Sequence, residues 1–190
     1  LVDRKLDRFN ENAFIEADNY KGGYLAAEHL VQCGCKNIVC MKEPTGYSSG
    51  RRRYEGYLDV CKKYNLKEQS VDCCYNYESG LRAAEEILKK YPEVDGVVAG
   101  NDIVAMSVYK VFTRHGKKIP QEVQLVGFDD VGFGELFIPE LTTIHQPIKE
   151  MGHLAAEIIL KAVNGEPYEK KNVFDVKLVE RETTKNMQNL

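Results

Sequence analysis

Residues 96–130 decide the fold class, and they read GVVAGNDIVAMSVYKVFTRHGKKIPQEVQLVGFDD. The stretch begins and ends with short apolar runs, Gly96 to Gly100 and Val123 to Gly127, which are typical of buried strands. Between them, Asn101 is placed to cap a helix and Gly116 to end it. The inward face of that helix is formed by Val104, Val108, Val111 and Phe112. Two strands joined through a helix by short connections predict a parallel pair with a crossover helix.

The same alternation continues on both sides of this stretch. Further helices are expected after a cap at Asp18-Asn19, around 54–61, around 81–88 and around 151–162, and further strands at 38–41, 71–75, 141–144 and 173–179. These strands are continuous apolar runs, so both faces of the sheet are expected to be covered by helices. The sequence therefore predicts an α/β fold with a doubly wound parallel sheet, which binds ligands beyond the carboxyl ends of its strands.

Composition excludes several functional classes. The 190 residues carry 29 acidic and 26 basic side chains, a net charge of −3, which gives no overall attraction to nucleic acid. No apolar run approaches the roughly 20 residues of a membrane-spanning helix. The histidines lack metal-binding spacing, and no glycine-rich phosphate loop follows a strand. Six cysteines without a Cys-x-x-Cys pair predict a reducing, cytoplasmic compartment. We expect no cofactor, no metal and no membrane partner.

Polar and aromatic side chains follow the predicted strands. They are Arg53 at the start of a helix, Tyr75, Asn101, Asp129 and Gln146, with Asp3 and Arg4 after Leu1-Val2. Carboxylate, guanidinium and carboxamide groups bind sugar hydroxyls, and an aromatic ring covers the apolar face of a sugar. This set favours a neutral, polyhydroxylated ligand. Each residue also has a simpler interpretation: Asn101 as a helix cap, Asp129 as a turn residue, and two of the three arginines at 51–53 as solvated charges.

One motif leaves an enzymatic alternative open. Residues 46–50 match the Gly-x-Ser-x-Gly elbow of serine hydrolases, and Asp129 with His145 would complete a triad in a suitable order. The elbow requires a sharp turn directly from strand to helix, whereas residues 42–45 intervene here and include Pro44. We therefore favour a protein that is not an enzyme.

Several segments together carry a resemblance to a known family. The longest are Ile119 to Asp130 (IPQEVQLVGFDD), Pro139 to Pro147 (PELTTIHQP) and Met151-Gly152. Asp3-Arg4, Glu28-His29-Leu30, Gly100-Asn101-Asp102 and the terminal Glu180-Arg181-Glu182-Thr183-Thr184 fit the same pattern. Over essentially all of its length, the chain resembles the effector-binding domain of the LacI/GalR family of bacterial transcriptional repressors.

This resemblance implies a two-lobed fold, like that of type I periplasmic binding proteins, with a small-molecule effector in the cleft between the lobes. The family's effector contacts fall on Asp3, Arg53, Tyr75, Asn101, Asp129 and Gln146. Arg4 follows Asp3 as in the ribose-type members, which favours a pentose or a similar small sugar.

The resemblance also implies a division of the chain. Residues 17–145 and 175–190 correspond to a complete carboxy-terminal lobe, and residues 1–16 and 146–174 to a partial amino-terminal lobe. The family binds operator DNA through a headpiece that is absent from this sequence. Because the leading strands of the amino-terminal lobe are also absent, we expect the helix at 148–164 to expose an apolar face and sugar affinity to be weak.

Two partner questions follow from the resemblance. Family members are homodimers, and the apolar cluster Phe133, Leu136, Phe137 and Ile138 is a candidate contributor to the interface, although the same side chains could instead pack inside the lobe. The alternative function is that of the solute-binding subunit of a sugar importer, which shares the fold. Cysteines in a non-disulfide arrangement and the segment Leu141 to Pro147 favour the regulator.

Overall fold

The computed structural model describes residues 1–2, 13–44, 47–132, 134 and 138–185. Its main body is a six-stranded sheet with the order β3-β2-β4-β5-β6-β8. These strands are β2 (Ile38–Lys42), β3 (Ser70–Asp72), β4 (Gly96–Val98), β5 (Gln124–Asp129), β6 (Thr143–His145) and β8 (Lys177–Val179). Neighbours are parallel except for β8, which runs antiparallel to β6. The predicted α/β class with a largely parallel sheet is confirmed.

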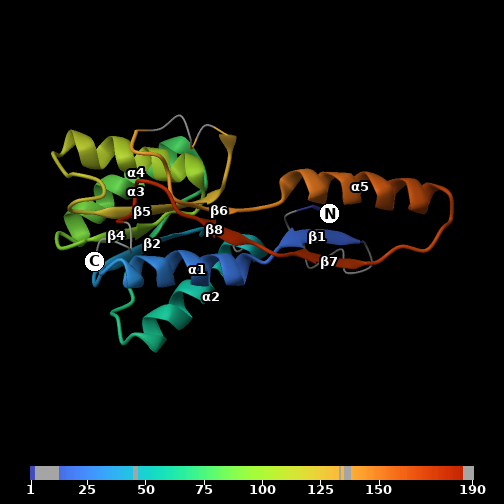
Figure 1. The fold of residues 1–190 in the computed structure, drawn as a ribbon, viewed down its shortest axis with the longest axis horizontal. Coiled ribbons are helices and arrows are strands. Elements are labelled where there is room, and N and C mark those ends of the chain that lie inside the picture. Colours follow the sequence, from blue (N-terminus) through green and yellow to red (C-terminus); the bar gives the residue numbers. More distant parts are fainter. Residues whose placement is uncertain (3–12, 45–46, 133, 135–137, 186–190) are drawn as a thin grey trace.

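Helices cover both faces of this sheet (Figure 1). On one face lie α1 (Asn19–Gln32) and α2 (Ser48–Lys63), and on the other lie α3 (Tyr77–Lys90) and α4 (Asp102–Arg114). Each pair of helices closes a separate hydrophobic core. One core is built around Ala27, Leu30 and Tyr57, and the other around Ile87, Val108 and Phe112.

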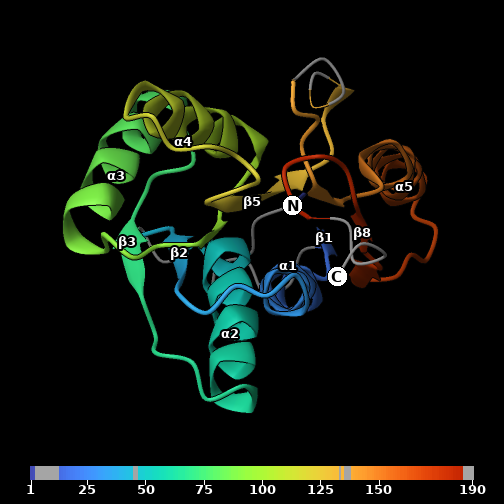
Figure 2. The same ribbon diagram turned by 60° about the vertical axis from the view of Figure 1, so that its left-hand side comes forward.

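A smaller unit extends from the main body (Figure 1). It contains a two-stranded parallel sheet, β1 (Phe14–Ala17) with β7 (Lys171–Phe174), and α5 (Ile148–Val163). Among the described residues, the chain passes between the two units three times: from β1 to α1, from β6 to α5, and from β7 to β8. Figure 2, turned by 60°, shows α5 near the edge of the sheet formed by β8, whereas α3 lies toward the opposite edge, formed by β3.

Local capping signals correctly predicted where α1 and α4 begin. The Asp18 carboxylate accepts a hydrogen bond from the Lys21 backbone N–H at 3.0 Å and caps α1. The Asn101 side-chain oxygen does the same for the Val104 N–H at 2.9 Å and caps α4. Both bonds satisfy backbone donors that a helix cannot pair internally.

Two strand predictions need correction, and one strand was not predicted. The strand expected at 71–75 is β3, which ends at Asp72. The single strand expected at 173–179 is two strands, β7 and β8, which belong to different sheets because the chain crosses between units at residues 175–176. β1 was not predicted at all. Its partner β7 lies more than 150 residues away in the sequence, and short strands of this kind depend on pairing rather than on local propensity.

The outer face of α5 is exposed, as expected from the sequence. Met151 and Ile158 are buried toward β1, whereas Ile159, Leu160 and Val163 are 62%, 65% and 80% exposed. None of the described helices is both long and apolar enough to cross a bilayer. Of the six cysteines, all but Cys74 are buried.

Candidate functional site

Arg53 is the buried cation at the centre of the site. It lies in the second turn of α2 and is only 7% exposed. Its Nε donates to the Asn19 side-chain oxygen at 2.8 Å, and Nη1 donates to the Gly100 carbonyl at 2.6 Å. The guanidinium carbon lies 3.5 Å from the centroid of the Phe128 ring. Three groups therefore hold the guanidinium plane, which is the arrangement that permits directional recognition of hydroxyls.

Arg51 and Arg52 do not share this environment. Both are exposed, and both contact Glu55 of the same helix, at 3.8 Å for Arg51 and 2.6 Å for Arg52. The expectation that two of the three arginines are solvated is confirmed. Helix periodicity explains the difference, because only one of three consecutive helix positions faces the sheet.

Asp129 supplies the opposite charge at the end of β5. Its Oδ1 lies 3.9 Å from Arg53 Nη2 and accepts a hydrogen bond of 2.6 Å from Gln146 Nε2. Asp129 and Asp130 both have positive φ, 114° and 58°. Such conformations cost on the order of 1–3 kcal/mol each and concentrate at functional sites. The turn directs the first carboxylate toward Arg53 and the second away from it.

Tyr75 and Asn101 complete the cluster. The Arg53 guanidinium lies 5.7 Å from the Tyr75 ring centroid, and Asn101 Nδ2 donates to the Tyr75 carbonyl at 3.3 Å. A Cβ at Gly100 would lie 2.0 Å from the Tyr75 ring, so the absence of a side chain there lets the ring pack on the β4 end. The structure thus brings Arg53, Tyr75, Asn101, Asp129 and Gln146 together. Asn101 is also the N-cap of α4, so its interpretation as a helix cap is confirmed.

The other predicted site residues, Asp3 and Arg4, lie outside the described residues, as do Phe133, Leu136 and Phe137 of the apolar loop cluster. Ile138 is described and is 86% exposed. Its carbonyl accepts a hydrogen bond of 2.8 Å from the Tyr109 hydroxyl of α4. The interpretation that this side chain packs inside the lobe is therefore wrong for Ile138.

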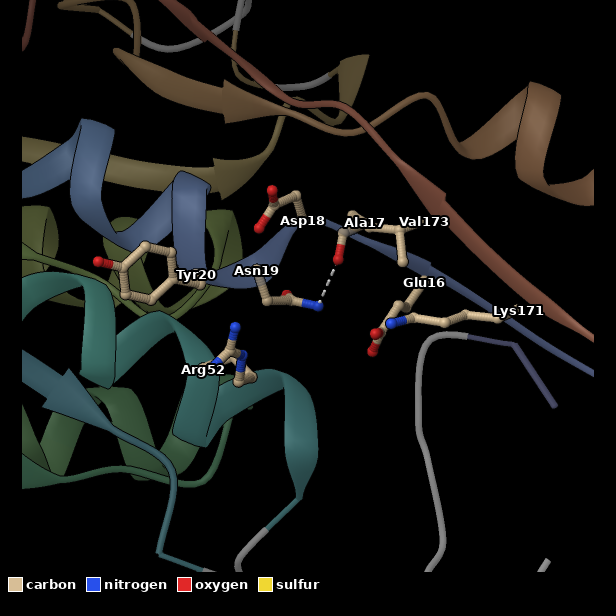
Figure 3. A pocket seen from close by; sticks show the side chains of 8 residues that line it. All are labelled: Glu16, Ala17, Asp18, Asn19, Tyr20, Arg52, Lys171 and Val173. Atoms are coloured by element: carbon tan, nitrogen blue, oxygen red, sulfur yellow. Dashed lines mark hydrogen bonds between the residues drawn. The ribbon is translucent and has the colours of Figure 1, made fainter. Parts of the chain in front are cut away.

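A cavity of about 340 Å³ opens beside Asp129 and Gln146. Its other walls are Val2, Ile148, Met151 and Gly152, so polar groups that follow β5 and β6 face apolar groups from the smaller unit. A second cavity, of about 220 Å³, is shown in Figure 3. It lies at the β1–α1 passage, where Asn19 lines it together with Arg52 and Lys171. Ligand sites commonly occupy such junctions between units.

The hydrolase alternative receives no support from the geometry. His145 Nδ1 is hydrogen-bonded to Asp130 Oδ2 at 2.8 Å, whereas the triad required Asp129. The Ser48 position begins α2 after a loop that separates it from β2, which ends at Lys42. The sharp strand-to-helix turn of a nucleophile elbow is therefore not formed.

Two further carboxylates, those of Asp102 and Asp130, lie next to the site residues Asn101 and Asp129 in the sequence. Asp102 is 1% exposed, and its oxygens accept from the Thr143 hydroxyl at 2.6 Å and from the Val131 N–H at 3.0 Å. Burial raises the pKa of Asp102 to about 6. Burial alone would also raise the pKa of Asp130, but hydrogen bonds from Arg181 and His145 outweigh it and hold that pKa below its ordinary value. These bonds connect the β5 and β6 ends to the loop after Asp130.

Sequence reasoning missed Asn19 and Phe128, the two side chains that position Arg53. Phe128 of β5 is buried, and a Cβ at Gly22 of α1 would lie 2.4 Å from its ring. No local signal distinguishes either residue, because Phe128 belongs to an apolar strand and Asn19 directly follows a helix cap. Their contact with Arg53 arises only when α1, α2 and β5 meet.

Comparisons with known proteins agree with this architecture. The family model of the periplasmic binding protein-like domain matches residues 27–184. The "Ribose operon repressor" of Halalkalibacterium halodurans is 33% identical over 187 residues, covering 97% of this chain and 56% of that protein. The chain therefore spans about half the length of this curated relative.

Solved structures give the same result. The structure described as a transcriptional regulator CelR–cellobiose complex is 27% identical and superposes with a TM-score of 0.90, covering 96% of this chain and 57% of the other. A LacI family transcriptional regulator from Enterococcus faecalis with bound ribose is 30% identical, with a TM-score of 0.86 and coverage of 96% and 67%. The chain is accordingly a periplasmic binding protein-like effector domain that belongs to the LacI/GalR family of transcriptional regulators.

Proposed function

We propose that the protein senses a small neutral sugar, with a ribose-like pentose favoured, and that the sugar controls operator binding by the intact regulator. The observation that carries this proposal is the contact of Arg53 and Asp129, which are linked to Gln146, Tyr75 and Asn101 at the carboxyl ends of the strands. One guanidinium and one carboxylate supply donors and acceptors without a net charge, which suits hydroxyl groups better than a phosphate or a carboxylate ligand.

The comparisons support the sugar class but differ in the sugar. One relative is named for the ribose operon, one structural neighbour holds ribose and another holds cellobiose. The preference for a pentose rests on Arg4 after Asp3 in the sequence. We assign Asp3, Arg4, Arg53, Tyr75, Asn101, Asp129 and Gln146 as the effector contacts, without a cofactor.

The proposed action needs no chemical step in the sugar. We propose that the protein is not an enzyme and that the sugar redistributes two arrangements of the lobes, as in other ligand-controlled equilibria. The lobes are residues 17–145 and 175–190, and residues 1–16 and 146–174, in keeping with the two sheets of the fold. Operator DNA would be contacted by a headpiece outside this sequence, and the protein would act in the cytoplasm, where that DNA lies.

The test is a titration of the 190-residue chain with D-ribose and, separately, with D-ribose 5-phosphate. Binding is monitored by NMR, which can measure weak affinities. We expect saturable binding of D-ribose and about tenfold weaker binding of the phosphate, which the Asp129 carboxylate repels. Arg53→Met should weaken D-ribose binding by about tenfold or more, because a charged donor is lost. Equal responses of the native chain and Arg53→Met, or a preference for the phosphate, would exclude the proposed site.

The importer alternative predicts the same sugar binding and must be separated differently. The amino-terminal sequence of the full-length product distinguishes the two: a helix-turn-helix supports the regulator, and a secretion signal supports the importer subunit. The named relatives favour the regulator, since all three are described as repressors or transcriptional regulators.

We also propose a homodimer through the loop after β5, where Phe133, Leu136, Phe137 and Ile138 lie in sequence. The exposed Ile138 side chain and the nearby bond from Tyr109 support this choice. Ile138→Asp should shift sedimentation at micromolar concentration toward the monomer, because a charge would enter an apolar interface. The control is Val163→Asp on the exposed face of α5, which should leave any loop-mediated dimer intact. An unchanged sedimentation profile for Ile138→Asp would refute this interface.

A further inference from the structure

The Asn19 side chain lies between the sugar site and the passage from β1 to α1. It is 2% exposed. Its Nδ2 donates to the Ala17 carbonyl at 3.0 Å, and its Oδ1 accepts from Arg53 Nε at 2.8 Å. Figure 3 shows the carboxamide beside Ala17, with the bond to the Ala17 carbonyl drawn as a dashed line.

This pair of bonds fixes the orientation of the carboxamide. Rotating the group by half a turn would place its nitrogen against Arg53 Nε and its oxygen against the Ala17 carbonyl, two repulsive contacts. An apolar side chain of the same size would leave a buried charged donor and a buried carbonyl unpaired. A carboxamide, which accepts on one side and donates on the other, therefore pairs both of these buried groups.

The Ala17 carbonyl belongs to the passage between the two units. Ala17 is the last residue of β1 and pairs with Phe174 of β7, and the next backbone N–H, that of Asp18, donates to the Phe174 carbonyl at 2.8 Å. A movement of the smaller sheet relative to the main body must therefore act on this carbonyl. Asn19 connects that carbonyl directly to Arg53.

Asp129 is held in a comparable way by Gln146. Gln146 follows β6 and precedes α5, so it lies on a second passage between the units, and its Nε2 donates to Asp129 Oδ1. Each of the two charged residues of the site is thus bonded to a carboxamide on a different passage. The Asn19 bond uses Nε of Arg53 and leaves Nη2 directed toward Asp129.

We propose that Asn19 is a positioning residue of the sugar site, which sets the plane of the Arg53 guanidinium and couples it to the β1–α1 passage. The role in sugar binding rests on the proposed function above. The positioning of Arg53 does not, and it is measurable without a ligand.

The first measurement is hydrogen exchange of the Arg53 Nε–H, observed by NMR in the sugar-free chain. Exchange should be slow in the native protein and about tenfold faster in Asn19→Ala, which removes the acceptor. Asn19→Asp keeps an oxygen opposite Nε and should restore slow exchange. Asn19→Ser, whose hydroxyl is too short to bridge, serves as a second variant in case Asn19→Ala does not fold, and should exchange as fast as Asn19→Ala.

The second measurement is D-ribose affinity in a double-mutant cycle with Arg53→Met. Asn19→Ala should weaken binding by about tenfold, and Asn19→Asp by no more than about threefold. In the Arg53→Met background, Asn19→Ala should have no additional effect, because a residue that acts through Arg53 loses its influence when Arg53 is gone.

Asn172→Ala is the matched control. Asn172 also donates from its carboxamide to a β1 carbonyl, that of Phe14 at 3.4 Å, and to the Glu169 carbonyl at 3.0 Å. It contacts no residue of the sugar site among these bonds, so Arg53 exchange and ribose affinity should both stay at the native value.

Unchanged Arg53 exchange in a folded Asn19→Ala or Asn19→Ser variant would refute the positioning role, and additive losses in the cycle would refute action through Arg53. If the native chain and all variants fail to bind D-ribose while exchange responds as expected, the proposed sugar is wrong and the positioning role stands. The two failures are therefore distinguishable.

Discussion

Gly23→Ala is expected to lower the free energy of unfolding by about 3 kcal/mol, the upper part of the range for overpacked cores. A Cβ at Gly23 would lie 1.9 Å from the Arg53 carbonyl oxygen, which is backbone and cannot turn aside. Gly56 of α2 makes the reciprocal contact, since its Cβ would lie 2.2 Å from the Tyr20 carbonyl oxygen of α1. The two helices can accommodate a methyl group only by moving apart, and Arg53 would move with α2. Urea denaturation, read as the midpoint at constant m-value, measures the loss.

The control for this substitution is Gly152→Ala. Gly152 lies inside α5. Apart from its chain neighbours and the nearby backbone of α5 itself, no atom lies within 4 Å of a Cβ placed there. Alanine in an exposed helix interior is more favourable than glycine by roughly 0.5–1 kcal/mol. The same chemical change should therefore have opposite signs at the two positions. A Gly23→Ala protein within 0.5 kcal/mol of the native one would show that α1 and α2 are not in backbone contact at this point.

The second large effect is a dependence of stability on pH that originates at Asp102. In the unfolded chain this carboxyl group has its ordinary pKa near 3.8, whereas burial raises the pKa to about 6 in the folded protein. Between these values the folded state binds more protons than the unfolded state, so stability falls as the pH rises through this window. Two pKa units correspond to on the order of 3 kcal/mol. The loss should be complete slightly above pH 6.

Asp102→Asn removes this pH dependence and keeps hydrogen bonds to Val131 and Thr143. The amide oxygen would accept from the Val131 N–H, and the amide nitrogen would donate to the Thr143 hydroxyl oxygen. Relative to the native protein, the variant should therefore gain about 2–3 kcal/mol between pH 4 and pH 7 in urea unfolding experiments.

Comparison of the two proteins also removes the contributions of other groups. Burial lowers the pKa of His29, which makes stability rise with pH through the same region, and the lowered pKa of Asp130 acts below about pH 4. Both occur in the native protein and in the variant. Asp72→Asn, the same chemical change at an exposed strand edge, serves as the control. Parallel profiles for the native protein and Asp102→Asn would contradict the raised pKa.

Much of the architecture was available from the sequence because its signals are local. Asp18 and Asn101 cap their helices through bonds to backbone groups three residues away, which fix the starts of α1 and α4. Continuous apolar strands indicated a sheet covered on both faces, and the two cores lie on those faces. Strand order in such a sheet places β4 and β5 next to each other, so Asn101 and Asp129 were correctly expected at one edge.

Which strands pair across long distances in the sequence could be learned only from the tertiary structure. Residues 171–179 form one apolar-rich run in sequence, yet β7 pairs with β1 and β8 pairs with β6, because the chain crosses between two sheets at residues 175–176. The predicted strand at 71–75 included Cys73. In the structure, β3 ends at Asp72, which pairs with Lys42, the last residue of β2. Strand limits follow from the partner, and the partner is not encoded in the local pattern.

The sequence by itself determined which chemical groups the site contains: one guanidinium, carboxylates, carboxamides and an aromatic ring at the ends of apolar strands. The tertiary structure alone decided how Arg53 is held, because Asn19, Gly100 and Phe128 come from three elements that meet only after folding. Capping and periodicity act over a few residues, whereas the orientation of a side chain depends on atoms that the fold brings from elsewhere in the chain.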